Sequence, residues 1–213
     1  MKNNSATLDP LKEELANSIT HGIGVVLSII GIALLIPNAV LKGSWVAVLS
    51  CALFGGSMLL LYLFSTLYHS IQHEQIKPVL KLLDHMGIYL LIAGTYSPFL
   101  LMQIQGTTGW IAFGLIWVIA ILGILYKWFF RHRFEKLSLA LYLGMGWLVV
   151  LIGKPFIETV PTSSIVFIVL GGLCYTVGTW FYAQKNRQFF HAIWHGFVLA
   201  GTITHFIAVM MLF

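Results

Sequence analysis

Three observations in the sequence predict an all-α integral membrane protein that forms a single bundle of seven transmembrane helices. The first is composition: of 213 residues, 59% are hydrophobic and only 9% are charged, and the mean hydropathy is +0.90. Soluble domains are about half apolar and about one quarter charged. The second is the recurrence of long apolar stretches. The third is that most basic residues lie in every second segment between these stretches, and these segments would share one side of a membrane.

Seven apolar stretches are long enough, or nearly long enough, to cross a bilayer. A hydrocarbon core about 30 Å thick needs about 20 helical residues. The fifth stretch is the shortest, and Pro155 with the polar turn after it predicts where that stretch ends. The predicted spans cover approximately residues 19–40, 45–69, 79–102, 110–130, 137–153, 163–184 and 190–213.

The predicted domain organisation is simple. Residues 1–18 form a cytoplasmic N-terminal segment, and residues 19–213 form one seven-helix transmembrane domain. Asp9-Pro10 has the pattern of an N-cap followed by proline at the first helical position. The apolar residues that follow share one helical face and predict a short amphipathic helix leading into the membrane: Leu11, Leu15 and Ile19.

The distribution of lysine and arginine predicts the orientation. If the N-terminus is cytoplasmic, only Lys42 and Lys154 lie outside. The inside residues are Lys2, Lys12, Lys77, Lys81, Lys127, Arg131, Arg133, Lys136, Lys185 and Arg187. This bias predicts a cytoplasmic N-terminus and an external Phe213, as an odd number of spans requires. The net charge of +5 therefore indicates a multi-pass protein of the cell membrane, in contact with lipids, rather than a nucleic-acid partner.

In this topology, polar residues from separate spans reach the same depth. His69 ends the second span, Asp84 lies near the start of the third, and His191 and His195 open the seventh. All four therefore lie at the cytoplasmic side. Hydropathy alone does not require this agreement, so we interpret it as a candidate functional site.

The segment His191-Ala-Ile-Trp-His195 has the spacing of a metal chelate. Its two imidazoles lie one turn apart on one helical face, with about 6 Å between the Cβ atoms. His69 would complete a set of three histidines and leave a fourth position open, as in catalytic zinc sites. The alternative is that histidines near membrane ends only reach the lipid headgroups. The depth shared with His69 favours a zinc (Zn²⁺) site.

Asp84 admits two interpretations. Lys77-Pro78 has the pattern of a helix start, so Asp84 lies more than one turn inside the helix and is not its N-cap. A structural role would be an ion pair with Lys81. A functional role would be to accept or steer a proton of a water molecule at the metal. We favour the functional role because an ionisable residue within a span is costly.

The remaining histidines have less specific patterns. His73 and His132 lie in or beside basic loops and are expected to be solvated. His85 is expected to pack or to support the site, because it points about 100° away from Asp84 on the helix. His205 lies on an apolar face in the outer half and is expected to be buried and hydrogen-bonded.

The polar motifs together resemble those of the hemolysin III family, the bacterial branch of the progestin and adipoQ receptors. The resemblance covers nearly the whole chain. The segment before the first span also resembles the family's sequence at this position. The motifs are Glu14-x-x-Asn17-x-x-x-His21-Gly22, Ser65-x-x-x-His69, Asp84-His85-x-Gly87-Ile88 and His191-x-x-x-His195.

The resemblance implies a seven-helix bundle in which His69, His191 and His195 hold zinc. It also implies that Asp84 lies beside a water molecule at the metal and that Ser65 lies close by. The family is related to the alkaline ceramidases, which implies zinc-dependent hydrolysis of a lipid amide or ester bond. Asp84 and Ser65 are then the expected catalytic residues, and a lipid or acyl chain is the expected substrate.

Two other functions compete with hydrolysis. The protein could be a non-catalytic receptor or regulator of membrane homeostasis, in which zinc only ties helices together. It could also be a pore-forming cytolysin, as the family name suggests, although no polar channel face is visible in the spans. A transporter is disfavoured because the outer halves of the spans contain almost no ionisable residues.

Overall fold

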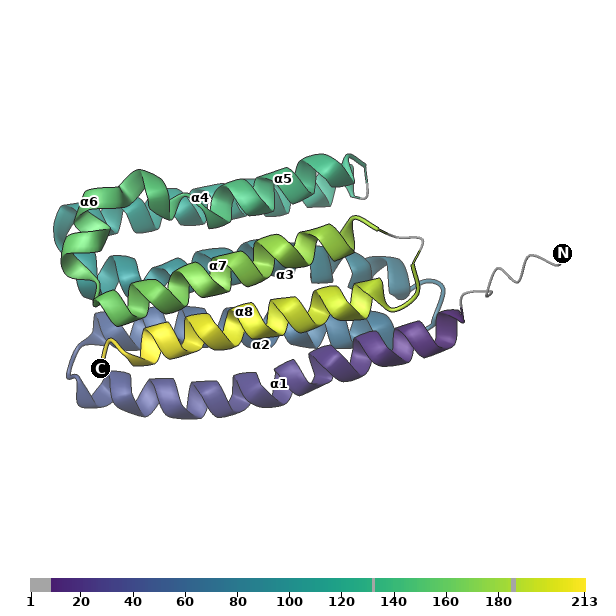
Figure 1. The fold of residues 1–213 in the computed structure, drawn as a ribbon, viewed down its shortest axis with the longest axis horizontal. Coiled ribbons are helices and arrows are strands. Elements are labelled where there is room, and N and C mark those ends of the chain that lie inside the picture. The colour runs from purple at the N-terminus through teal and green to yellow at the C-terminus, as the bar shows by residue number, and fades with distance from the viewer. Residues whose placement is uncertain (1–8, 132, 185–186) are drawn as a thin grey trace, which may run out of the picture.

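The computed structural model describes residues 9–131, 133–184 and 187–213, and this part of the chain contains helices and no strand. Seven segments are long and apolar enough to cross a membrane, and they lie side by side in one bundle (Figure 1). The predicted all-α membrane fold is confirmed. The helices are α1 (Pro10–Leu41), α2 (Trp45–Ser70), α3 (Lys77–Pro98), η1 (Phe99–Ile104), α4 (Gly106–Phe130), α5 (Glu135–Gly146), α6 (Val149–Thr159), α7 (Thr162–Tyr182) and α8 (Phe190–Met210).

Helix α1 begins where the sequence predicts a helix start. The Asp9 side chain accepts a hydrogen bond from the Lys12 backbone N–H at 3.3 Å, and Pro10 follows at the first helical position. The helix then continues without interruption through residues 18 and 19 to Leu41. The amphipathic segment is therefore the first part of a single 32-residue helix, and Leu11 and Leu15 are exposed on its surface.

The fifth span differs from the prediction. It consists of α5 and α6, and it ends at Thr159 rather than near residue 153. Gly153 has φ 37° and ψ −100°, a conformation that interrupts the helical hydrogen bonding. Pro155 therefore stands at the start of a new helical segment, where its missing N–H costs little. For this reason Pro155 does not end the span, as its position in the sequence had suggested.

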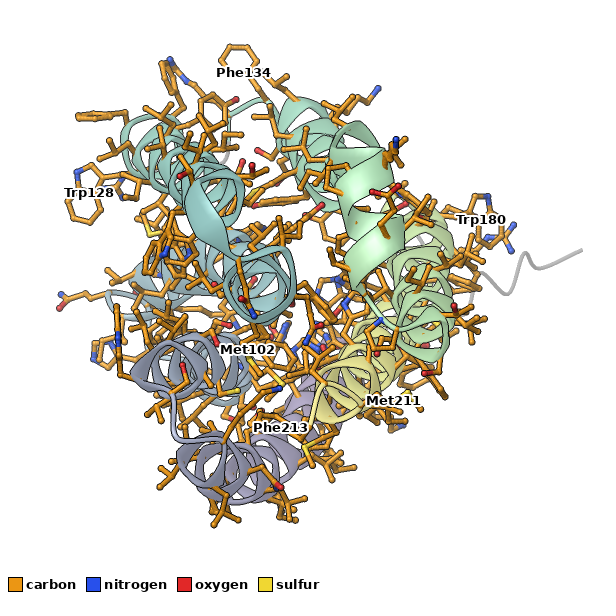
Figure 2. All side chains as sticks on the ribbon, turned by 90° about the vertical axis from the view of Figure 1, so that its left-hand side faces the viewer. Met102, Trp128, Phe134, Trp180, Met211 and Phe213 are labelled. Carbon is orange, nitrogen blue, oxygen red and sulfur yellow. The ribbon has the colours of Figure 1, made fainter. Side chains whose placement is uncertain are left out.

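The apolar residues divide between the centre and the outside of the bundle. Phe54 and Tyr62 of α2 and Leu35 of α1 are almost fully buried in the core. Large aromatic side chains such as Trp128 and Trp180 instead project from the periphery (Figure 2) and are about 60% exposed. An exterior of this kind suits hydrocarbon rather than water. The protein is a multi-pass membrane protein.

One end of the bundle collects the polar motifs. The starts of α1, α3 and α8 and the end of α2 lie at this end, which we call the histidine end (Figure 1). Phe213 lies at the opposite end, as an odd number of crossings requires. Which end faces the cytoplasm remains a prediction from the basic residues, and two of those, Lys2 and Lys185, lie outside the described residues.

Candidate metal centre

Three histidines that are far apart in the sequence converge at the histidine end. His69 comes from the last turn of α2, and His191 and His195 come from the first two turns of α8. One ring nitrogen from each lies within 4.8 Å of the corresponding nitrogens of the other two. His69 and His195 are buried, and His191 is partly buried. This is the set of residues for which the sequence predicts a metal site.

The second nitrogen of two of these rings is held by an oxygen atom. His69 Nδ1 donates a hydrogen bond to the Glu14 carboxylate, and His195 Nδ1 lies 3.3 Å from the Asn17 backbone carbonyl. Carboxylate and carbonyl oxygens only accept, so each Nδ1 carries the proton and each Nε2 presents a lone pair. Metal-binding histidines are oriented in this way in known sites.

Two of the three histidines also have a ring nitrogen without a protein partner among the described residues. His69 Nε2 and His191 Nε2 are buried and have no hydrogen-bond partner in the described part of the chain. Buried polar atoms of this kind are rare because leaving them unpaired is costly. A metal ion would satisfy them both, and three imidazoles are a ligand set that zinc commonly takes. The residues present therefore fit a zinc ion.

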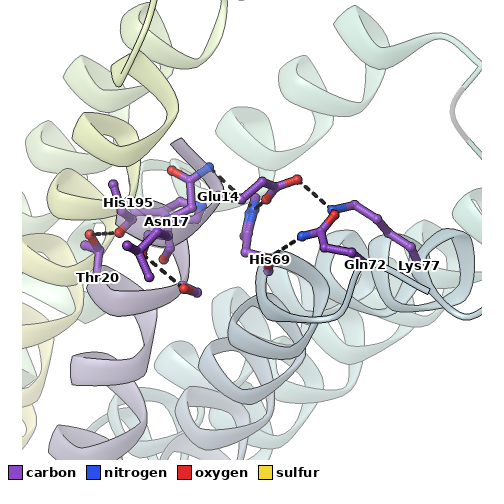
Figure 3. A network of polar contacts seen from close by, with 10 residues as sticks. Glu14, Asn17, Thr20, His69, Gln72, Lys77 and His195 are labelled. Carbon is purple, nitrogen blue, oxygen red and sulfur yellow. Dashed lines mark hydrogen bonds and ion pairs between the residues drawn. The ribbon is translucent and has the colours of Figure 1, made fainter. Parts of the chain in front are cut away.

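Glu14 belongs to a closed network of polar contacts around His69 (Figure 3). Lys77 Nζ donates to Glu14 Oε1 at 2.6 Å and to Gln72 Oε1 at 2.6 Å. Gln72 Nε2 in turn donates to the His69 backbone carbonyl at 2.9 Å. The network links α1 to the end of α2 and the start of α3, and it fixes the His69 ring.

The roles of Glu14, Asn17 and His21 were not predicted, although all three occur in the motif at the start of α1. The signal that could have found them is their spacing, since positions i, i+3 and i+7 lie on one helical face. The His21 ring stacks on the His195 ring with centroids 3.5 Å apart, and it meets Tyr62 edge-on at 5.0 Å. His21, on α1, therefore packs against the histidine cluster and supports it.

Asp84 and Ser65 lie beside the histidine cluster. Asp84 is in the second turn of α3, so it is not an N-cap, and among the described residues no ion pair joins it to Lys81. Asp84 lines the same cavity as His69, and Ser65 is fully buried on α2 one helical turn before His69, with no hydrogen-bond partner for its Oγ among the described residues. The structure therefore brings Asp84, Ser65 and His69 together. Their catalytic roles remain predictions.

The other described histidines lie where the sequence places them. His73 is exposed, and His205 is buried with its Nε2 3.0 Å from the Ile168 backbone carbonyl, so both predictions are confirmed. His85 lines the cavity beside the cluster, and its Nδ1 lies 2.6 Å from the Lys81 backbone carbonyl. His132 is outside the described residues.

A cavity of about 330 Å³ opens in front of the cluster. His69, Asp84, His191 and His195 contribute to its wall. A second, mainly apolar cavity lies between α3, α5, α7 and α8, and we call it the chamber. The two cavities share part of their walls, because four residues line both of them: Leu61, Ile88, Trp194 and Val198.

The fold and the site together define a class: a multi-pass membrane protein with a candidate three-histidine metal centre at one end of a seven-helix bundle. Comparison with known sequences is more specific. The chain belongs to the Haemolysin-III related family, whose sequence profile matches residues 10–206. The resemblance to the hemolysin III family is thereby confirmed.

Individual relatives agree with this assignment. The chain is 48% identical over 200 residues to the Hemolysin-3 homolog of Bacillus subtilis (strain 168), which covers 94% of each protein. It is 46% identical to Hemolysin-3 of Bacillus cereus, over 94% of this chain and 91% of that protein. A more distant relative is the human Monocyte to macrophage differentiation factor, 27% identical over 92% of this chain and 83% of that protein.

Proposed function

We propose that this protein is a zinc-dependent hydrolase of the cell membrane that cleaves an amide or ester bond of a lipid. The observation that carries the proposal is the convergence of three imidazole nitrogens within 4.8 Å, beside a carboxylate and in front of a cavity. Three protein ligands with an open fourth position are typical of catalytic zinc rather than structural zinc.

His69, His191 and His195 would hold the metal. When bound, zinc supplies a Lewis acid that activates water at neutral pH and polarises a carbonyl group. Glu14 and the Asn17 carbonyl keep two of the rings in the tautomer that binds metal. The site therefore does not have to reorganise these rings in order to take up the ion.

Asp84 is the expected general base. Its carboxyl group lies on the cavity wall, where it can accept a proton from water and later return it to the leaving group. Ser65 lies one helical turn before His69 on α2, and its hydroxyl has no hydrogen-bond partner in the described residues. It is therefore free to orient either the carboxylate or the substrate oxygen.

The chamber indicates the kind of substrate. Its lining is mainly aliphatic and aromatic, and it borders the cavity at the histidine cluster across a shared wall. An acyl chain in the chamber would place its carbonyl carbon at the cluster, with the chain directed into the membrane. A membrane lipid with an acyl amide or ester bond meets both requirements.

A non-catalytic receptor or regulator is the second candidate. The observation that favours it is that the cluster joins the end of α2 to the start of α8, so a metal there would tie two distant helices together. A pore-forming cytolysin has less support. The described core between the helices is filled by apolar side chains such as Leu35, Phe54 and Met58, which argues against a water-filled path through one chain.

The deciding experiment measures zinc content and lipid hydrolysis on the same purified protein in nanodiscs. The panel contains ceramides, phospholipids and acyl esters, with a chelator-treated sample as the control. We expect about one zinc per chain and release of a free fatty acid that stops when zinc is removed. Zinc-loaded protein that cleaves no member of the panel would favour the regulator.

A further inference from the structure

One residue that lines the chamber has a buried polar atom without a hydrogen-bond partner among the described residues. Six hydroxyl side chains line the chamber, and each has a hydrogen-bond partner within the protein; they are Thr95, Tyr96, Tyr142, Tyr175, Thr176 and Thr179. His205 also lines the chamber and is only 9% exposed. Its Nδ1 is buried and has no partner in the described part of the chain.

The position of the His205 ring determines the chemistry of this nitrogen. Nε2 lies 3.0 Å from the Ile168 backbone carbonyl, which can only accept, so Nε2 carries the proton. The ring lies against Gly171, where any Cβ would overlap it, and Tyr175 packs on it edge-on at 5.4 Å. No carboxylate is among the described residues lining the chamber, so the ring has no counter-ion there and is neutral. Nδ1 is therefore an unpaired hydrogen-bond acceptor.

We infer that His205 is a second binding point in the chamber, one that accepts a hydrogen bond from a hydroxyl group on the lipid chain. An unpaired buried acceptor requires a donor, and a plain acyl chain offers none. Because His205 lines the chamber and no described residue supplies a donor, a molecule in the chamber is the source that we infer, with a small shift of the ring exposing Nδ1 to it. A lipid hydroxyl is the donor that an otherwise apolar ligand can carry.

The helix geometry sets where that hydroxyl lies. His195 and His205 are on the same helix, α8, and lie about 15 Å apart along its axis. This step rests on the proposed function, in which the carbonyl group lies at the histidine cluster. The hydroxyl must then be far along the chain from the carbonyl, rather than next to it.

The test uses binding and not turnover. Octadecanoic acid, 2-hydroxyoctadecanoic acid and 12-hydroxyoctadecanoic acid, each radiolabelled, are bound to the zinc-loaded protein in nanodiscs, and empty nanodiscs correct for partition into lipid. We expect the 12-hydroxy acid to bind about two- to tenfold more tightly than the other two, the gain from one hydrogen bond. Equal affinity for all three acids, or an equal gain for the 2-hydroxy acid, would overturn the inference.

Three variants assign the preference to His205. His205→Phe keeps a ring but removes the acceptor, and it should abolish the preference for the 12-hydroxy acid. Thr204→Val is the matched control, because Thr204 does not line the chamber and its hydroxyl already donates to the Gly201 carbonyl on the same helix, and it should keep the preference. If His205→Phe does not fold, His205→Asn, which retains an acceptor oxygen, should keep the preference. A preference that persists in His205→Phe, or that is lost in Thr204→Val, would contradict the assignment.

The outcome separates this inference from the proposed function. Selective binding of the 12-hydroxy acid by a protein that hydrolyses no lipid would support the binding point at His205 and refute the hydrolase. Lipid hydrolysis without any such selectivity would refute the binding point alone.

Discussion

Glu14 and His69 are 55 residues apart in the sequence, and the Glu14 carboxylate accepts a hydrogen bond from His69 Nδ1. The contact joins the first turns of α1 to the last turn of α2. It holds the His69 ring so that Nε2 faces the other two histidines. Lys77 supports the carboxylate from the start of α3.

The first prediction concerns this contact. Glu14→Ala removes the acceptor that orients His69, so zinc affinity should fall by about 10- to 100-fold while the protein still folds. Zinc titration with a competing chelator measures the change. Glu158→Ala, at an exposed carboxylate in α6 that pairs loosely with Lys154, is the control and should leave the affinity unchanged. An unaltered affinity in Glu14→Ala would mean that the contact does not position the ligand.

The second prediction concerns the ligands. Each of the three single variants His69→Ala, His191→Ala and His195→Ala should have a much lower zinc content, because the two remaining imidazoles hold the ion weakly. Elemental analysis of the purified variants measures this. His73→Ala removes an exposed histidine and should retain full occupancy. A double variant, His191→Ala with His195→Ala, that still binds one zinc per chain would contradict the three-histidine zinc site.

The third prediction separates an enzyme from a regulator. Asp84→Asn preserves the shape of the side chain but cannot take a proton at neutral pH. Lipid hydrolysis should fall by about 100- to 10,000-fold while the zinc content stays the same. Ser65→Ala should lower lipid hydrolysis by a smaller factor, because water can partly replace a hydroxyl that only orients another group. Unchanged hydrolysis in Asp84→Asn would exclude the carboxylate as the base.

The fourth prediction concerns orientation. The excess of basic residues at the histidine end predicts that this end, with the N-terminus, faces the cytoplasm and that Phe213 faces outward. Reporter fusions at the two ends of the chain give the sidedness of each. Two termini on the same side would contradict the seven crossings, and an inverted result would place the histidine cluster outside the cell.

Much of the fold was predictable from the sequence because a membrane imposes simple rules on it. Only helices of sufficient length satisfy their backbone groups in hydrocarbon, so the apolar stretches locate the seven spans. The helix-capping pattern of Asp9-Pro10 located the start of α1. The sequence did not locate the end of the fifth span, because neither hydropathy nor Pro155 reveals the backbone conformation of Gly153.

The candidate site, too, was only partly predictable from the sequence. The sequence by itself determined that His69, His191 and His195 reach one depth, because helical rise converts position in a span into depth. Only the tertiary structure decided which groups meet across helices: Glu14 accepts from His69, His21 stacks on His195, and His205 lines the chamber and has an unpaired ring nitrogen. The physical reason is that depth follows from one helix alone, whereas rotation about the helix axis is set by packing against the neighbouring helices.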